Sequence, residues 1–367
     1  MFRLELRGEP SRRMAMLSPL FAVVITVSIG IVMFLAMGKD PLVGTSTFFI
    51  EPVKTRYALS ELALKATPLV LIGLGLAVCF RSNVWNIGAE GQFILGAIFA
   101  GGVATHATES TSRLVVIPIL LAGMLGGALW AGVVAGLRDR YNASEILVSL
   151  MLVYVANMLL SYLVHGPWKD PHGYNFPQTA MFASTTLIPK LVTGFRTDIG
   201  LVLSLVLAGG FWVFVFRSYF GFQLTVGGLA PAAARYAGFS SRRALWTALL
   251  LSGAMAGLAG ALETAGPLGQ LTPHVPAGYG FAAIIVAFVG RLHPVGIVLS
   301  SILMSMLYIG GELAQARLGM PKSVTGVFQG ILLFALLGCD SLIHYRVRFG
   351  RRSPAPARAA GVVITSP

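Results

Sequence analysis

The sequence predicts an all-α protein, a polytopic transmembrane helical bundle of about ten spans, some of them discontinuous. Two compositional features support this class. Hydrophobic residues make up 56% of the chain and charged residues only 11%, whereas a soluble domain carries roughly 25% charged residues. Apolar runs of about 20 residues also recur, which is the length that a helix needs to cross a hydrocarbon core. We therefore expect one membrane domain over residues 1–345 and a basic, disordered cytoplasmic tail over residues 346–367.

Ten apolar segments fit this architecture. They lie near residues 17–37, 66–80, 91–108, 114–137, 145–165, 199–216, 244–265, 279–290, 294–314 and 324–339. The first is too long for the core of a signal peptide, and no clean small-x-small cleavage pattern follows it, so we interpret it as an uncleaved span. The second and the eighth are short, and short segments in transporters often belong to discontinuous helices around a pathway.

The basic residues orient the chain. If the N-terminus lies inside, all the lysines fall in the outer connecting segments, while most of the arginines fall in the inner ones. An excess of basic residues in cytoplasmic segments is the usual sign of membrane orientation, so we expect both termini in the cytoplasm. The formal net charge of +13 then reflects an inner face that lies against anionic lipid, and it does not indicate nucleic-acid binding.

Small residues four positions apart recur within the predicted spans, and such pairs let helix backbones approach closely in lipid. The pairs are Gly123 and Gly127, Gly132 and Gly136, Gly253 and Gly257, and Gly326 and Gly330. They predict a compact bundle and do not indicate a substrate.

A polar stretch at residues 81–92 separates two apolar runs too closely to be an ordinary aqueous loop. Backbone that breaks a helix at membrane depth must be buried in protein or line a cavity, and an ionisable residue there is a candidate functional group. The candidate pathway residues are Trp85, Asn86, Glu90, Gln92 and Asn157. The alternative is structural, with polar side chains that satisfy backbone groups and hold neighbouring helices together. Under that alternative Glu90→Gln keeps most of the hydrogen bonds.

A second interruption, at residues 227–243, predicts a short helix of about two turns between two long apolar runs. Pro231 fits the first helical position, where its missing N–H is no loss, and Gly238 can adopt the left-handed conformation that ends a helix. Such a helix is too short to be stable alone in water. We interpret it as a rigid surface that presents Arg235 and Tyr236 to a cytoplasmic partner protein. The alternative is an ordinary interfacial loop helix.

The longest outer loop, at about residues 166–198, is rich in proline and aromatic residues. This composition predicts an ordered loop that docks a partner or caps the pathway. The sequence contains no P-loop for ATP, no His-Glu-x-x-His and no Gly-x-Ser-x-Gly motif. We therefore expect no catalytic residue, no metal ligand and no cofactor. The chain is then a channel, an ion-coupled carrier, or a subunit that a separate ATPase drives.

Residues 83–92, followed by Ala97, resemble the signature of ABC importer permeases of the branched-chain amino acid, ribose and nucleoside superfamily. Residues 228–238 are similar to the coupling helix of that superfamily, which docks on the ATPase. The coupling residues that this resemblance implies are Leu229, Ala230, Pro231, Ala234, Arg235, Tyr236 and Gly238. One position departs from the pattern, because Ala230 stands where Asn or Ser usually caps the helix. The loss of such a cap costs about 1 kcal/mol.

Residues 145–152 and 165–178 are similar to permeases for nucleosides and simple sugars that work with basic-membrane-protein-type binding lipoproteins. The resemblance implies a permease subunit that imports nucleosides by alternating access, with simple sugars and branched-chain amino acids as alternative substrates. It implies the cytoplasmic (inner) membrane of a prokaryote. It also implies three protein partners: an ABC ATPase subunit that binds ATP, a second, heterologous permease subunit, and an extracytoplasmic binding lipoprotein or periplasmic binding protein.

Two other classes remain open on the sequence. A stand-alone secondary carrier or channel needs coupling-ion carboxylates within the spans, and Glu90 is the one candidate buried acid. An intramembrane enzyme needs a nucleophile–base pair or a metal cluster in the spans, and the sequence pattern shows neither. Co-purification with an ATP-binding subunit distinguishes the permease from both.

Overall fold

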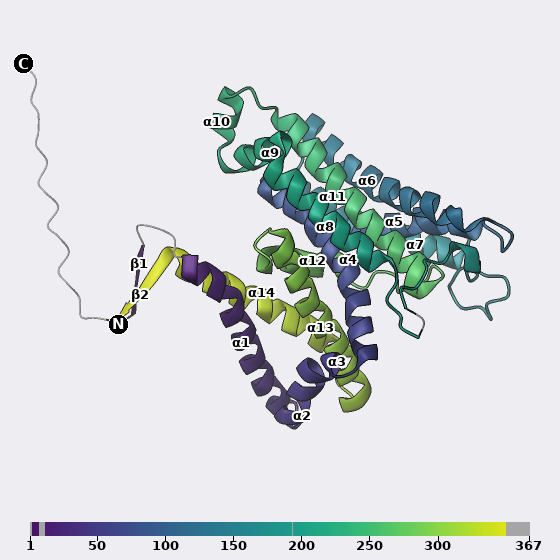
Figure 1. Ribbon diagram of the computed structural model, residues 1–367, viewed down its shortest axis with the longest axis horizontal. Coiled ribbons are helices and arrows are strands. Elements are labelled where there is room, and N and C mark those ends of the chain that lie inside the picture. The colour runs from purple at the N-terminus through teal and green to yellow at the C-terminus, as the bar shows by residue number, and fades with distance from the viewer. Residues whose placement is uncertain (1, 7–11, 193, 350–367) are drawn as a thin grey trace, which may run out of the picture. The chain divides into compact units, whose positions relative to one another are not determined.

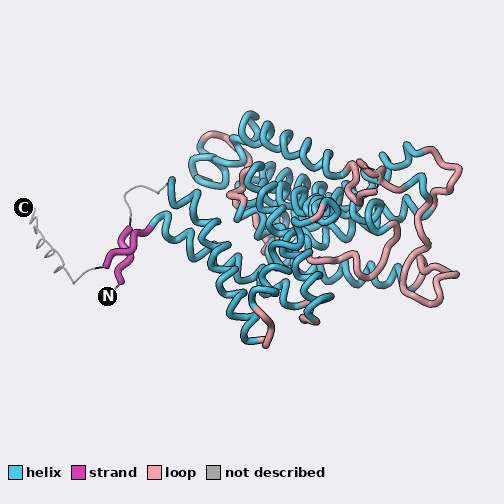
Figure 2. The backbone as a smooth tube through the Cα atoms, turned by 60° about the horizontal axis from the view of Figure 1, so that its bottom comes forward, coloured by secondary structure: helices cyan, strands magenta, loops and turns pink. Residues whose placement is uncertain are grey.

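The computed structural model describes residues 2–6, 12–192 and 194–349 of the 367-residue chain. Helices form most of this part, and one pair of strands accompanies them (Figure 2). The all-α class and the transmembrane bundle are therefore confirmed.

The chain divides into two compact units. The larger unit is Ser28–Ile331, and the smaller unit combines Met1–Val27 with Leu332–Pro367. Two helices contribute residues to both units, namely α1 (Arg12–Ala36) and α14 (Ser323–His344).

The larger unit holds most of the spans. In chain order these are α4 (Arg56–Arg81), α5 (Ala89–Thr105), α6 (Val116–Tyr141), α7 (Glu145–His165), α8 (Gly200–Arg217), α11 (Ser241–Glu263), α12 (Tyr279–Val289) and α13 (Pro294–Leu318). Two shorter helices, α2 (Pro41–Thr45) and α3 (Glu51–Lys54), precede these spans, and two more, α9 (Tyr219–Leu229) and α10 (Pro231–Tyr236), connect α8 to α11. Helix α11 contacts α4, α5 and α6, while α4 also contacts α12 and α13 (Figure 1). Helix α4 thus joins two groups of helices.

Eight helices in the described part are long and apolar enough to cross a membrane, and two shorter apolar helices, α5 and α12, accompany them. These segments coincide with the predicted spans. The prediction of a short second span is wrong, because α4 has 26 residues. Its first turns carry Arg56, Glu61 and Lys65, and these charges made that part of the helix look like a loop. The eighth span is short as predicted, with 11 residues in α12.

Glycine lets α11 lie directly against α6. A Cβ atom at Gly257 would lie 2.1 Å from the carbonyl oxygen of Gly123, and one at Gly127 would lie 2.1 Å from that of Gly253. No larger residue fits at either position without a shift of backbone. These two predicted pairs therefore pack helices together within the chain.

The other two predicted glycine pairs are less constrained. Gly132 and Gly136 have only side-chain neighbours, at 3.5 and 3.8 Å from an added Cβ atom. Gly326 and Gly330 have no neighbour within 4 Å of such an atom in the described part of the chain. Within residues 2–6, 12–192 and 194–349, no helix therefore packs closely against this last pair.

The smaller unit contains a two-stranded antiparallel ribbon. Strand β1 (Phe2–Leu6) pairs with β2 (Tyr345–Phe349). Apolar and charged residues alternate along both segments, which is the period of two that a strand requires. The expectation of a disordered tail is thus corrected for residues 346–349, and residues 350–367 lie outside the described part.

Candidate functional site

The polar stretch breaks the helix where the sequence predicts it. Helix α4 ends at Arg81 and α5 begins at Ala89. The chain turns through Asn83, whose φ of 56° lies in the left-handed region that asparagine tolerates better than most residues. Residues 82–88, called the break below, form a non-helical connection between α4 and α5, and Asn86 within it is fully buried.

Asn86 holds the start of α5 against α11. Its Nδ2 donates to Gln92 Oε1 at 2.9 Å and to Ser252 Oγ at 3.0 Å. Its Oδ1 accepts from Gln92 Nε2 at 3.0 Å and from the amide of Gly88 at 3.2 Å. All three polar side chains are at most 1% exposed. A buried polar network with its groups satisfied rigidifies its surroundings, which favours the structural interpretation of Asn86 and Gln92.

Glu90 caps the N-terminal end of α12. Its side chain is 2% exposed, and its carboxylate accepts from the amides of Gly278, at 2.8 Å, and of Gly280. Amides in the first turn of a helix have no partner within the helix, and a carboxylate there also interacts favourably with the helix dipole. A Cβ atom at position 280 would lie 2.2 Å from the backbone nitrogen of Glu90. The contact therefore requires glycine.

The other two candidates keep accessible surface. Trp85 is 40% exposed, and its ring lies 5.4 Å from that of Phe80 and 6.2 Å from that of Phe288, between centroids. Asn157, on α7, is half-buried and donates to the carbonyl of Val153 at 3.0 Å. Its hydrogen bond therefore lies within its own helix rather than between helices.

The described residues of the long loop after α7, 166–192 and 194–199, are ordered, as predicted, and lie at the end of the bundle opposite α10 (Figure 1). The amide of Thr179 donates to the carbonyl of Leu271 at 3.0 Å, and the amide of Leu271 donates to Thr179 Oγ1 at 3.0 Å. Ser184 donates from its amide and its hydroxyl to the carboxylate of Glu109, and these bonds lower the pKa of Glu109. The loop is therefore fixed to segments on either side of it.

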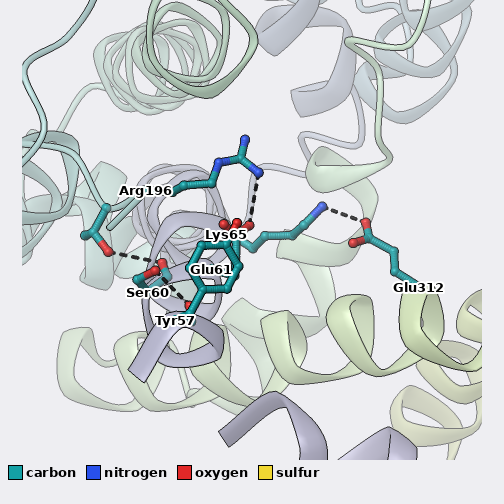
Figure 3. A network of polar contacts seen from close by, with 7 residues as sticks. Tyr57, Ser60, Glu61, Lys65, Arg196 and Glu312 are labelled. Carbon is teal, nitrogen blue, oxygen red and sulfur yellow. Dashed lines mark hydrogen bonds and ion pairs between the residues drawn. The ribbon is translucent and has the colours of Figure 1, made fainter. Parts of the chain in front are cut away.

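Ion pairs at the same end join three segments (Figure 3). Lys65 on α4 donates to Glu312 on α13 at 2.7 Å, and Arg196 in the loop lies 3.4 Å from Glu61 on α4. Glu61 and Lys65 are one helical turn apart, so one face of α4 carries both. Sequence reasoning missed these contacts because it began the second span at residue 66. The signal that could have found them is the i,i+4 spacing of opposite charges next to an apolar run.

Asp198 precedes α8 at this end and is 5% exposed. Its Oδ1 accepts from the amide of Gly200 at 3.0 Å, which stabilises the carboxylate. Burial is the larger effect and raises the pKa of Asp198 to about 6. A carboxyl group at the loop end therefore changes charge near pH 6.

Helix α10 forms as the sequence predicts. It covers Pro231–Tyr236, six residues, with proline in its first turn. Gly238 follows with a φ of 79°, and the amide of Phe239 donates back to the carbonyl of Ala234 at 2.9 Å. Ala230 provides no side-chain cap, as expected for alanine.

Most of the predicted coupling residues are on the surface. The exposed ones are Leu229, Ala230, Pro231, Arg235, Tyr236 and Gly238. Tyr236 is 98% exposed, while Ala234 is only 4% exposed and anchors the helix. A cavity of about 320 Å³ lies behind α10, lined by α9, α10, the start of α11, and Ser82 and Val84 of the break. The exposed helix therefore sits next to the polar stretch.

Comparisons with known proteins bear on this arrangement. A family model described as "Branched-chain amino acid transport system / permease component" matches residues 58–337. The chain is 33% identical to the glucose ABC transporter permease protein TsgB13 of Haloferax volcanii, over 97% of this chain and 98% of that protein. It is 29% identical to the guanosine ABC transporter permease protein NupP of Bacillus subtilis, over 91% and 95%. It is 27% identical to the nucleoside ABC transporter permease protein NupB of Lactococcus lactis, over 87% and 89%.

Proposed function

Because the chain belongs to the family of permease components of branched-chain amino acid transport systems, we propose that it forms, with partner subunits, the translocation pathway of an ABC importer for nucleosides. The observation that carries this substrate class is the similarity to permeases named for guanosine and for nucleosides. Simple sugars are the second candidate, supported by the higher identity to a glucose permease. Branched-chain amino acids are the third, supported by the description of the family.

Helix α10 is the coupling helix in this proposal, and it docks in a groove of a separate ATPase subunit. Its exposed Arg235 and Tyr236 and its buried Ala234 support the assignment, because a short helix must be held from behind in order to transmit force. ATP is bound by the ATPase subunit, so this chain needs neither a catalytic residue nor a cofactor of its own.

The candidate pathway residues divide into two groups. Trp85 and Asn157 have accessible surface and line the pathway in this proposal. Asn86, Glu90 and Gln92 are buried, and they shape the pathway by holding α5, α11 and α12 in place rather than by touching the substrate.

The ends of the bundle have different partners. The α10 end faces the cytoplasm of a prokaryote, with both termini on that side, since the arginines concentrate in the connecting segments there. The ordered loop at the opposite end docks an extracytoplasmic binding protein or lipoprotein. A second, heterologous permease subunit completes the pathway, and anionic lipid contacts the basic face.

Reconstitution tests the proposed function. The chain, its partner permease and the ATPase are co-purified and placed in proteoliposomes, and uptake of radiolabelled guanosine, uridine, glucose, ribose and leucine is measured with the binding protein present. We expect ATP-dependent uptake of guanosine or uridine that requires every subunit. Uptake that is driven by an ion gradient without the ATPase contradicts the proposal and supports a secondary carrier.

A further inference from the structure

We propose that residues 81–90 form a relay between the α9–α10 pair and both ends of α12, and that Arg81 is the positioning residue of this relay. The inference rests on the proposed function, because α10 is the point at which an ATPase displaces the chain. It goes further by naming the contacts that carry this displacement into the membrane-embedded part.

The first contact of the relay joins α9 to the last residue of α4. A Cβ atom at Gly228, on α9, would lie 2.1 Å from the carbonyl oxygen of Arg81 and 3.0 Å from the carbonyl carbon of Ser82. The two backbones therefore touch without an intervening side chain. Helix α9 contacts α10 directly, so a displacement of α10 toward the bundle also displaces Arg81.

The side chain of Arg81 continues the relay to the C-terminal end of α12. Its Nε donates to the carbonyl oxygen of Leu292 at 3.1 Å, and its guanidinium carbon lies 4.5 Å from the centroid of the Phe216 ring. Leu292 belongs to the turn that ends α12, where it has a φ of 53° and its amide donates to the carbonyl of Ala287 at 2.9 Å. A planar guanidinium can stack on a ring and donate in its plane at the same time, which an ammonium group cannot.

Glu90 completes the relay at the N-terminal end of α12, through the amides of Gly278 and Gly280. Between the two ends, Trp85 of the break lies against Phe288 in the last turn of α12. The ten residues 81–90 therefore contact α12 at its start, at its last turn and in the turn that follows it.

Helix α12 is short, and its length explains why it depends on contacts at its ends. A helix of 11 residues is about 16 Å long, roughly half the thickness of a hydrocarbon core. A helix of this length cannot reach both aqueous faces, so at least one of its ends lies within protein, where its free backbone groups need partners. Because the partners at both ends belong to residues 81–90, α12 moves with this segment as a rigid body. Displacement of α10 then changes the position of α12 within the bundle.

Two matched pairs of variants in the reconstituted importer test the relay. Gly228→Ala is compared with Gly227→Ala, since position 227 has nothing within 4 Å of an added Cβ atom in the described part. Arg81→Gln is compared with Arg217→Gln, which removes an arginine that lies over the ring of Trp212 at the same end. The measured quantity is the ratio of guanosine molecules transported to ATP molecules hydrolysed. If the wild type imports glucose instead, glucose replaces guanosine in this ratio.

We expect Gly228→Ala and Arg81→Gln to lower this ratio at least tenfold, while the ATPase stays bound and hydrolyses ATP within twofold of the wild-type rate. The two control variants stay within twofold of wild type. Arg81→Lys recovers part of the ratio, because an ammonium group can reach the carbonyl of Leu292 without stacking. Wild-type ratios in both relay variants, or equal losses in the controls, overturn the relay.

Hydrogen exchange supplies a measurement that does not depend on transport. In the purified chain in nanodiscs, Gly228→Ala and Arg81→Gln should speed exchange at the amides of Gly280 and Leu292 at least tenfold, with no change along α6. Unchanged exchange at both amides overturns the relay. If the wild-type importer moves none of the tested substrates while exchange still responds, the proposed function fails and the relay stands.

Discussion

The break and helix α10 interrupt the apolar pattern of the chain in similar ways, but the structure uses their polar residues in opposite ways. In the break, Asn86 is fully buried, and both the nitrogen and the oxygen of its side-chain amide make hydrogen bonds. Glu90, which follows the break, is 2% exposed. On α10, Tyr236 is 98% exposed. Unpaired polar groups are costly in protein and in lipid alike. Buried and hydrogen-bonded polar groups therefore hold the bundle together, whereas the exposed polar surface of α10 is available to the partner subunit that we propose.

This difference implies different responses to mutation. Substitutions in and around the break should lower the free energy of unfolding of the chain. Substitutions on the exposed face of α10 should leave that free energy unchanged and should weaken assembly with the ATPase. Each region can therefore be tested with a readout to which the other does not respond.

Gly280→Ala is expected to have the largest effect on stability. The new Cβ atom would lie 2.2 Å from the backbone nitrogen of Glu90, so α12 must move away and weaken both carboxylate bonds. Overpacking of this kind costs about 3 kcal/mol. The measurement is the thermal stability of the purified chain in detergent. Gly326→Ala, with no neighbour within 4 Å in the described part, serves as control, and equal melting temperatures for the two variants would contradict the contact.

Glu90→Gln is expected to have the next largest effect, and here the structure changes the expectation from sequence. The carboxylate accepts from two amides, whereas a glutamine side chain has one acceptor oxygen and turns its NH2 group toward the second amide. An unsatisfied buried donor costs about 2 kcal/mol. Asn157→Ala removes only a bond within α7 from a half-buried side chain and should cost less than about 0.5 kcal/mol. Equal stability in the two variants would show that the cap of α12 contributes nothing.

The features that sequence reasoning predicted correctly depend on local signals. The spans follow from apolar runs, and the break follows from a polar stretch too short for an aqueous loop. The limits of α10 follow from the conformational preferences of Pro231 and Gly238, because proline fits the first turn and glycine adopts the φ of 79° that ends the helix. Each of these signals is complete within a few residues of the chain.

The features that it missed depend on partners far apart in the chain. Glu90 bonds to amides near residue 280, and Lys65 pairs with Glu312. A single sequence contains no record of which distant segment satisfies a given charge. The charges on the first turns of α4 therefore looked like a loop, although Glu61 and Lys65 pair with residues of the loop after α7 and of α13.

Ala230→Ser is expected to stabilise α10, by less than the substitutions around the break destabilise the chain. Ala230 is exposed and offers no side-chain cap to α10, so a hydroxyl there can accept from an amide of the first turn. Such a cap stabilises a helix by about 1 kcal/mol. Slower hydrogen exchange at the amides of Ala232 and Ala233 is the expected result. Unchanged exchange would mean that the bundle, and not the cap, determines the stability of α10.

Tyr236→Ala should have the smallest effect on the chain itself, within about 0.5 kcal/mol of the wild-type free energy of unfolding, because the side chain is 98% exposed. In the assembled importer the same tyrosine would be buried against the ATPase, and interface tyrosines are often among the residues that dominate affinity. We expect at least a tenfold rise in the dissociation constant for the ATPase, measured by titration in nanodiscs. Tyr174→Ala is the matched control, since Tyr174 is 93% exposed on the loop at the opposite end. If both variants bind the ATPase as the wild type does, the exposure of Tyr236 on α10 does not indicate a binding partner. The break and α10 would then differ only in how deeply their polar residues are buried.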